Sequence, residues 1–533
     1  MQGFVVDNNQ KGHTMQTTFN HGPGLSRRHL LAGLGSAAGL ALVAPTWRRA
    51  HAAGALLRVG LSAYPSNFSP FANVGTAAET VKLQSFRGLM SYEPDGKLRG
   101  ELAESWKQDD DTTVVFNLRP AKFHNGDPVT ADDVVFSFET MGAEPSTAFM
   151  KPFFASLAAI EAVDPKTVRI KLKAPDAAFL VGLASYDAPV VSRRSMKEDA
   201  TKPVGAGPYL VTGMERGTAI DLKAFDGFFR PGLPKSPLLR FVVYADESAR
   251  VAALRSGDVD LIEYVPSPAM GAIEQDANLA LDAVEGPASL VMFNVKSGPF
   301  VDPRVRRAVG YAIDRQAIID GAFSGRAALS GPLPLSRASP YFDPASVNIF
   351  KRDLAKAKAL LAEAGYPNGF TTSILATSQY SVHRDPAIVI QRSLVDVGIQ
   401  GELNLPDWAT RVQLGNKGQY HMSVTATSLD NNDPAGLDGV LGSGLPPAFS
   451  RPWGYANAEV DRLVRAGRST LDVDKRKAIY ADLEKAVVAD PGIISLVFRH
   501  QAYARRKAVS GFVNLPGFLT LTSGFAIETA SVG

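Results

Sequence analysis

The sequence predicts a mixed α/β (α+β) protein with more than one domain. Strand and helix patterns alternate along the chain, as expected for that class. The chain has 533 residues, whereas a typical domain has about 100–200, so two or three domains are expected. Apolar residues make up 45% of the chain, an ordinary share for a globular protein.

Each element rests on a local pattern. Thr130 and Asp133 have the spacing of a capping box, which opens a helix. Residues 168–173 alternate apolar and basic side chains, the pattern of a strand with one face in water. Asp302 followed by Pro303 is an N-cap followed by proline at the first helical position. Apolar periodicity predicts further helices at 353–365, 388–395 and 475–488, and strands at 220–224, 399–405 and 493–498.

The first 52 residues have the form of a cleaved export signal. Arg27 and Arg28 precede a run of about 14 mostly apolar residues, 30–43, and the segment 50–52 reads Ala-His-Ala. Paired arginines of this kind are typical of a signal peptide for the twin-arginine export route. The run is short for a bilayer core of about 30 Å, so export is favoured over the alternative, an N-terminal membrane anchor. The mature protein is therefore expected in the periplasm.

Charge and cysteine content exclude several classes. The chain has 56 Lys and Arg against 53 Asp and Glu, and removing residues 1–52 leaves 51 against 52. A nearly neutral protein has no basic surplus for phosphates, so no nucleic-acid partner is expected. The absence of cysteine excludes thiolate metal sites and cysteine nucleophiles.

Motifs of catalysis are missing from the sequence. It has no Gly-x-Ser-x-Gly elbow, no phosphate-binding loop and no His-Glu-x-x-His. The four histidines after the leader have no ligand-like spacing and are interpreted as surface or hydrogen-bonded residues: His124, His383, His421 and His500. No catalytic residue, metal or cofactor is therefore assigned.

Several motifs, in order over about 400 residues, resemble family 5 of the bacterial extracellular solute-binding proteins. This family includes the dipeptide, oligopeptide and nickel receptors of ABC importers. The motifs are Leu-Ala-Glu-Ser-Trp at 102–106, Phe-Asn-Leu-Arg-Pro-Ala-Lys-Phe at 116–123, Val-Thr-Ala-Asp-Asp at 129–133, Val-Gly-Ala-Gly-Pro-Tyr at 204–209, Asp-Pro-Arg-Val-Arg at 302–306 and Ala-Gly-Tyr-Pro at 364–367.

The resemblance implies two lobes joined by a hinge, with a ligand closed between them. It places lobe I at 55–75, 201–289 and 500–533, an additional domain at 76–200, and lobe II at 290–499. It also implies that Trp106, Phe116, Phe123 and Phe136 are core residues. Glycines 205 and 207 are expected to serve backbone geometry.

Two positions match the family's ligand residues. Trp408 falls where peptide receptors have a pocket tryptophan, and Asp430 falls where they have the aspartate that binds a peptide's α-ammonium group. A carboxylate in a closed cleft needs a cation, which a ligand amine supplies. Turn and core roles are the alternatives for these two residues. Tyr64 and Asn67 lie in a loop that contributes to the cleft in relatives.

Two departures from the family's pattern of ligand residues leave the identity of the ligand undecided. Peptide receptors commonly have a tryptophan three residues before the key aspartate, where this chain has Thr427. The arginine that binds the carboxylate in dipeptide receptors is missing from 375–379, and whether Arg384 replaces it is not decided by the sequence. The solute is expected to be a peptide, an opine or another amine-bearing amino-acid conjugate.

The resemblance favours a non-enzymatic receptor, a monomer, that delivers its solute to the membrane permease of an ABC transporter. The alternative is an exported enzyme such as a hydrolase, because the twin-arginine route carries folded proteins. The missing nucleophile, metal and cofactor motifs argue against that alternative.

Overall fold

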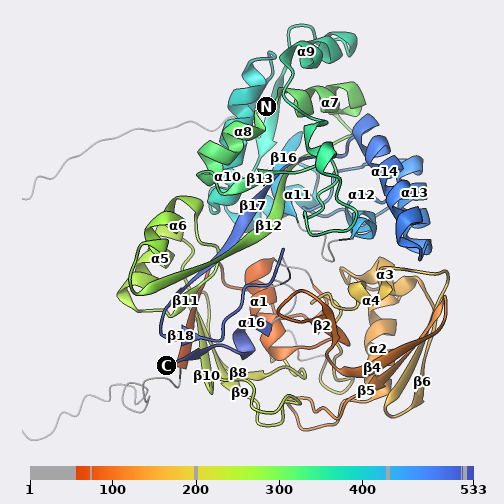
Figure 1. Ribbon diagram of the computed structural model, residues 1–533, viewed down its shortest axis with the longest axis vertical. Helices are drawn as coiled ribbons and strands as arrows, with labels where there is room; N and C mark the ends of the chain where they lie inside the picture. The colour runs from red at the N-terminus through yellow and green to blue at the C-terminus, as the bar shows by residue number, and fades with distance from the viewer. Residues whose placement is uncertain are drawn as a thin grey trace, which may run out of the picture. The chain divides into compact units, whose positions relative to one another are not determined.

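A computed structural model describes residues 56–65, 67–72, 75–196, 202–427, 433–517, 519 and 525–533. The predicted export signal and Asp430 lie outside these residues. Residues 51–533 form one compact unit, and the fold below is the fold of that unit (Figure 1). Within its described part, no helix combines the length and the apolar character needed to cross a bilayer.

A large mixed sheet is the frame of the protein. Its strands follow the spatial order β15-β14-β16-β12-β17-β11-β1-β10-β9-β8, and β13 pairs with β17 beside this path. The strands are β1 (Leu56–Leu61), β8 (Tyr209–Glu215), β9 (Ala219–Ala224), β10 (Leu238–Val243), β11 (Leu261–Ile262), β12 (Leu279–Phe293), β13 (Ala327–Leu329), β14 (Thr371–Leu375), β15 (Gln400–Asn404), β16 (Met422–Thr427) and β17 (Ile493–Arg506).

Two long antiparallel strands, β12 and β17, connect the two lobes (Figure 1). Strands β1 and β8–β11 belong to lobe I, and strands β13–β16 belong to lobe II. The pairing of β12 with β17 shifts register between Glu285 and Ala288, where the chain passes from one lobe to the other. The two-lobed fold is therefore confirmed, and the exact domain boundaries stay a prediction.

Helices cover the sheet of each lobe. Lobe I has α5 (Glu247–Ser256) and α6 (Ser267–Glu274), and α1 (Thr76–Ser85) follows its first strand. Lobe II has α7 (Pro303–Ala312), α8 (Arg315–Ala317), α9 (Leu354–Glu363), α10 (Ser381–Val395), α11 (Trp408–Asn416), α12 (Asp438–Leu441), α13 (Ala458–Ser469) and α14 (Val473–Ala489). Near the C-terminus lie β18 (Val509–Ser510), α16 (Phe525–Glu528) and β19 (Ser531–Val532).

The additional domain is built on a separate sheet with the order β4-β5-β7-β6. Its elements are β2 (Met90–Tyr92), β3 (Leu98–Gly100), β4 (Ala103–Asp110), β5 (Thr113–Leu118), α2 (Ala131–Gly142), α3 (Lys151–Ala155), β6 (Leu157–Asp164), β7 (Thr167–Leu172) and α4 (Phe179–Gly182). The capping box predicted at Thr130 and Asp133 is present, with both reciprocal hydrogen bonds.

Both faces of β12 are buried in lobe II, which explains its nearly continuous apolar sequence. Val291 and Phe293 pack into one core, and Leu290 and Met292 pack into another. The lobe II sheet is therefore packed on both faces.

The family motifs have structural roles here. Phe116 and Phe123 are fully buried, and Trp106 and Phe136 are partly buried against the same core. A side chain at Gly205 would place its Cβ 2.0 Å from the carbonyl oxygen of Ser85. The predicted backbone role of this glycine is confirmed, because only glycine permits so close an approach of two chain segments.

Candidate functional site

A cavity of about 690 Å³ lies between the lobes. Its wall combines segments that are distant in the sequence: the loop after β1, helix α1, residues 149–153 and 178–186 of the additional domain, and residues 379–383, 407–416 and 435–451 of lobe II. Cavities of roughly 300–1,000 Å³ suit small molecules and cofactors. The space fits a small solute and not a folded macromolecule.

Trp408, which the sequence predicted as a ligand residue, is one of the residues of the lobe II wall. It is the first residue of α11, and the N-cap carboxylate of Asp407 accepts a hydrogen bond from the Thr410 amide at 3.1 Å. The indole stacks on His383 with 5.6 Å between ring centres, and Tyr380 and Phe449 contact it edge-on. These aromatic neighbours fix the orientation of the indole before any solute binds.

A buried arginine lies behind this aromatic group. The guanidinium of Arg411 packs 5.2 Å from the ring centre of Trp408 and 5.3 Å from that of Phe449. Its burial lowers the pKa of Arg411 to about 10. Burial, together with the charges of Arg411 and Arg499, holds the pKa of His383 well below its ordinary value. His383 is therefore neutral at neutral pH, and the group acts as an apolar wall with positive charge behind it.

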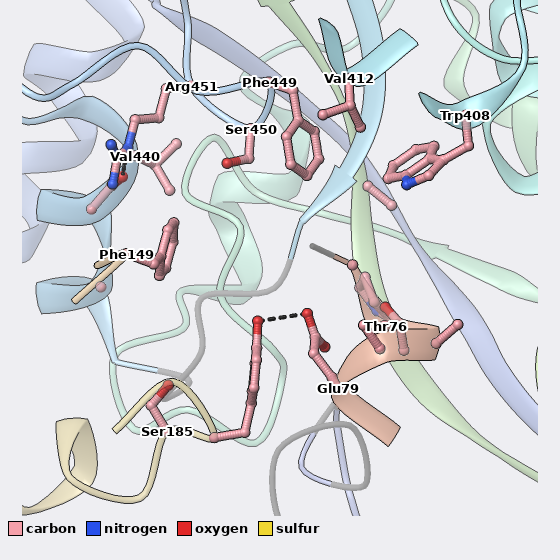
Figure 2. Close-up of a pocket in the computed structure, with 18 of the residues that line it drawn as sticks. Thr76, Glu79, Phe149, Ser185, Trp408, Val412, Val440, Phe449, Ser450 and Arg451 are labelled. Carbon is pink, nitrogen blue, oxygen red and sulfur yellow. Dashed lines mark hydrogen bonds between the residues drawn. The ribbon is translucent and has the colours of Figure 1, made fainter. Parts of the chain in front are cut away.

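An acidic side chain lies on the opposite wall. Glu79 of α1 is only 8% exposed and lines the cavity. The hydroxyl of Tyr186 donates a hydrogen bond to its carboxylate at 2.5 Å (Figure 2). In Figure 2, Trp408 and Phe449 lie across the cavity from Glu79. A carboxylate held in this way can accept a further hydrogen bond from an amine or a hydroxyl group of a solute.

The other predicted residues are placed as follows. Tyr64 lines the cavity, and burial is the main cause that raises its pKa. The Asn67 carboxamide accepts a hydrogen bond from the Ser69 amide at 3.0 Å, and Asn67 is not part of the described cavity wall. Arg384 pairs with the neighbouring Asp385 at 2.8 Å and does not line the cavity either. Asp430 lies outside the described residues.

Direct contacts hold the two lobes closed around the cavity. Arg468 of α13 forms ion pairs with Asp176 of the additional domain and, at 3.0 Å, with Asp438 of α12. Beside this pair, the Ala177 amide donates to the Arg468 carbonyl oxygen at 2.8 Å. We call this group, made of Asp176, Ala177, Arg468 and Asp438, the cross-lobe clasp. It joins segments 292 residues apart.

Further contacts cross the gap near the loop after β1. The Gln379 carboxamide accepts from the Trp408 amide at 3.2 Å and donates to the Ser62 carbonyl oxygen at 3.4 Å. A Cβ atom at Gly75 would lie 3.5 Å from the indole nitrogen of Trp408, so lobe I and lobe II touch at this tryptophan. The two lobes are thus in direct contact beside the cavity, as in a closed form.

Sequence reasoning missed the charged residues of the wall, among them Glu79 and Arg499. Glu79 sits in a helix with no motif around it, so no local signal could have found it. Arg499 directly follows the buried apolar run 493–498, and a basic residue in that place is an unusual feature. The histidine prediction also needs a correction, because His383 is buried and its Nδ1 has no hydrogen-bond partner among the described residues.

Comparison with known proteins agrees with this architecture. The family model described as "Bacterial extracellular solute-binding proteins, family 5 Middle" matches residues 97–443. The glutathione-binding protein GsiB of Pectobacterium atrosepticum is 30% identical over 526 residues, which cover 95% of this chain and 99% of that protein.

Solved structures show the same fold. The periplasmic binding protein AgaA of A. tumefaciens R10, in complex with agropinic acid, is 37% identical with a TM-score of 0.86, covering 90% of this chain and 99% of that chain. DppA of Helicobacter pylori, in complex with the peptide STSA, is 23% identical with a TM-score of 0.79, covering 90% and 98%. The chain therefore belongs to family 5 of the bacterial extracellular solute-binding proteins, the substrate-binding components of ABC importers.

Proposed function

We propose that the solute is a small, charged derivative of amino acids: a short peptide such as glutathione, an opine, or another amino-acid conjugate. The observation that carries this proposal is the cavity of about 690 Å³ between the lobes, which has an aromatic wall on lobe II and the carboxylate of Glu79 opposite. A polar solute can satisfy such groups on all sides, and closure removes most of its surface from water.

Relatives support this class of solute. GsiB is named for glutathione and AgaA was solved with agropinic acid, and this chain aligns with nearly their full lengths. A tripeptide and an opine are both compact acids built on amino acids. Dipeptides are less favoured for this chain, because 375–379 lacks the arginine expected of dipeptide receptors.

An amine of the solute is proposed to bind Asp430, with Trp408 and Tyr64 in contact with the rest of the molecule. Glu79 offers a second carboxylate on the other wall. Truncating one partner of a buried charge pair costs about 2–5 kcal/mol, so Asp430→Ala should weaken binding about 30- to 5,000-fold. Asp430→Asn should be nearly as damaging, whereas a turn aspartate would tolerate asparagine.

Calorimetric titration tests the proposed class directly. The probes are glutathione, agropinic acid, dipeptides and tetrapeptides, each added to protein from which bound solute has been removed by unfolding and refolding. Binding of glutathione, agropinic acid or a tetrapeptide, without any cleavage product in mass spectra, supports the receptor. Steady cleavage of a probe would instead support the hydrolase, and tight binding of dipeptides alone would contradict the proposed solute class.

We further propose that the protein acts in the periplasm as a monomer after removal of residues 1–52. Support comes from the paired arginines and the Ala-His-Ala segment. N-terminal sequencing of the protein from the cell envelope should give a start near Ala53. An intact Met1 in the membrane fraction would show that the segment is an anchor.

A further inference from the structure

Arg499 is a buried cation in the wall of the cavity. It lies on β17 opposite β13, with Ala327 as its partner residue, next to the register shift of β12 where the lobes meet. Its side chain is among the residues that line the cavity, and the residue is only 3% exposed. Pro287, in the same shift of β12, lines the cavity beside it.

The charge of Arg499 has no carboxylate partner among the described residues. Its Nη1 donates to the side-chain oxygen of Gln501 at 2.7 Å and, at 3.3 Å, to the His500 carbonyl oxygen. The ring of Tyr264 lies 5.6 Å from the guanidinium carbon. Its Nε has no hydrogen-bond partner in the part of the chain that the structure describes. A buried charge without a counter-ion is costly, so the arrangement calls for an anion.

Several other buried arginines of this protein pair with acids. Arg87 pairs with Glu101 and Glu528, and Arg476 pairs with Asp433. Arg315 has no acid either, but it donates to two backbone carbonyl oxygens and lies away from the cavity. Arg250 and Arg411 also have no ion pair with an acid among the described residues, but they do not line the cavity. Arg451 lines the cavity without such a pair, but its Nε and Nη1 donate to the carbonyl oxygens of Gly439 and Pro446. Arg499 differs because it lines the cavity without an acid partner and with a buried Nε that has no hydrogen-bond partner among the described residues.

The neighbours of Arg499 cannot supply the missing charge. His383 is kept neutral, and Arg411 adds a second positive charge behind the aromatic wall. The charge of Glu247 acts on Arg499, but the Glu247 carboxylate already accepts a hydrogen bond from the Ser381 amide at 3.1 Å. This part of the cavity therefore has a positive potential that a mobile anion can occupy.

We propose that Arg499 is the carboxylate anchor of the cavity and binds a carboxyl group of the solute. This rests on the proposed function, because it needs the cavity to hold the solute. The proposal also explains how the site could bind a carboxylate without an arginine at 375–379. The carboxylate would be bound by Arg499 on β17, one of the strands that join the lobes. Arginine suits this role because its planar guanidinium matches a carboxylate.

The test compares Arg499→Met with wild type, using glutathione, agropinic acid and their carboxyl esters as probes in calorimetric titration. We expect the variant to bind the free acids about 30- to 5,000-fold more weakly. The esters should bind wild type weakly and should lose little more in the variant, because the interaction is already gone. Arg315→Met is the matched control: it should lower the melting temperature and leave affinity unchanged.

The outcomes separate the two proposals. If no probe binds wild type, the proposed function fails and the anchor fails with it. If the acids bind wild type and Arg499→Met keeps their affinity, the function stands and the anchor is wrong. If Arg499→Met weakens acids and esters equally while its melting temperature falls as far as that of Arg315→Met, Arg499 is structural, which also overturns the anchor.

Discussion

Trp408 shows how one residue can serve a site through its neighbours. It is fixed by stacking on His383, by two edge-on aromatic contacts and by the cation of Arg411. A side chain fixed in this way loses little conformational freedom when a solute arrives, so more of the contact energy appears as affinity.

Replacement of Trp408 should therefore reduce affinity more than stability. Trp408→Ala removes an aromatic surface of the cavity wall. Loss of an aromatic hot spot costs at least about 2 kcal/mol, which corresponds to roughly a 30-fold weaker affinity. Trp408→Phe should lose only part of this affinity. Calorimetric titration with glutathione or agropinic acid measures the effect. Trp106→Ala, in the sheet of the additional domain, is the control and should affect melting temperature alone.

A second residue makes stability depend on pH. Burial is the main cause that raises the pKa of Glu484 on α14 to about 7, and the nearby charge of Asp343 adds to it. Between the ordinary pKa and this raised value, the folded protein keeps a proton that the unfolded chain releases. The free energy of unfolding should therefore fall as pH rises through this window.

Glu484→Gln should remove that dependence. Urea unfolding between about pH 5 and pH 8 measures it: the variant should gain stability relative to wild type as pH increases, and the gain should level off once pH exceeds the raised pKa. Parallel curves for the two proteins would show that Glu484 does not hold the proton.

At the scale of elements, local sequence patterns predicted the positions of the helices and strands well. Asp302 caps α7 and Thr130 caps α2, as predicted, because capping depends on residues two or three positions apart, which a sequence displays directly. The start of α10 was missed by several residues: it begins at Ser381 and includes Pro386, where periodicity predicted a start near 388. Packing against lobe II overrides the local signal there.

The residues of the cavity wall were harder to predict from the sequence than the helices. Trp408 and Tyr64 were found through their resemblance to the family, not through any local rule. Glu79 and Arg499 come together only because the chain returns to the same gap after about 400 residues, and no pattern within one element records that proximity.

The cross-lobe clasp should control how fast a solute leaves. Its ion pair between Arg468 and Asp176 can form only when the lobes are closed, and both side chains are largely buried. An ion pair that is neither fully exposed nor fully buried stabilises by about 1–2 kcal/mol. Arg468→Met should then raise the dissociation rate by roughly 5- to 30-fold, because it destabilises the closed form.

Stopped-flow displacement of a bound probe measures that rate. Arg462→Met is the matched control, because Arg462 lies on the same helix and, among the described residues, forms an ion pair only with Glu459 in the same turn. The control should leave dissociation unchanged. Equal rates in wild type and Arg468→Met would show that the clasp does not hold the closed form.

For the whole molecule, solute should compact the protein and stabilise it. The cavity and the paired strands between the lobes indicate a hinge motion, and a solute that contacts both lobes stabilises the closed form. At free solute of about 100 times the dissociation constant, stabilisation should reach about 2.7 kcal/mol. Small-angle scattering with and without a bound probe measures the compaction, and an unchanged radius of gyration at saturation would contradict the hinge.

The position of β17 near the end of the chain has a consequence for biosynthesis. This strand pairs with β11 of lobe I, with β13 of lobe II and with β12 between them. A growing chain therefore cannot complete the sheet of either lobe until Arg506 has left the ribosome. Until then the edges of β11, β12 and β13 stay unpaired, and such edges attract other strands. Both lobes should become protease-resistant together and late, as a single event at the end of translation.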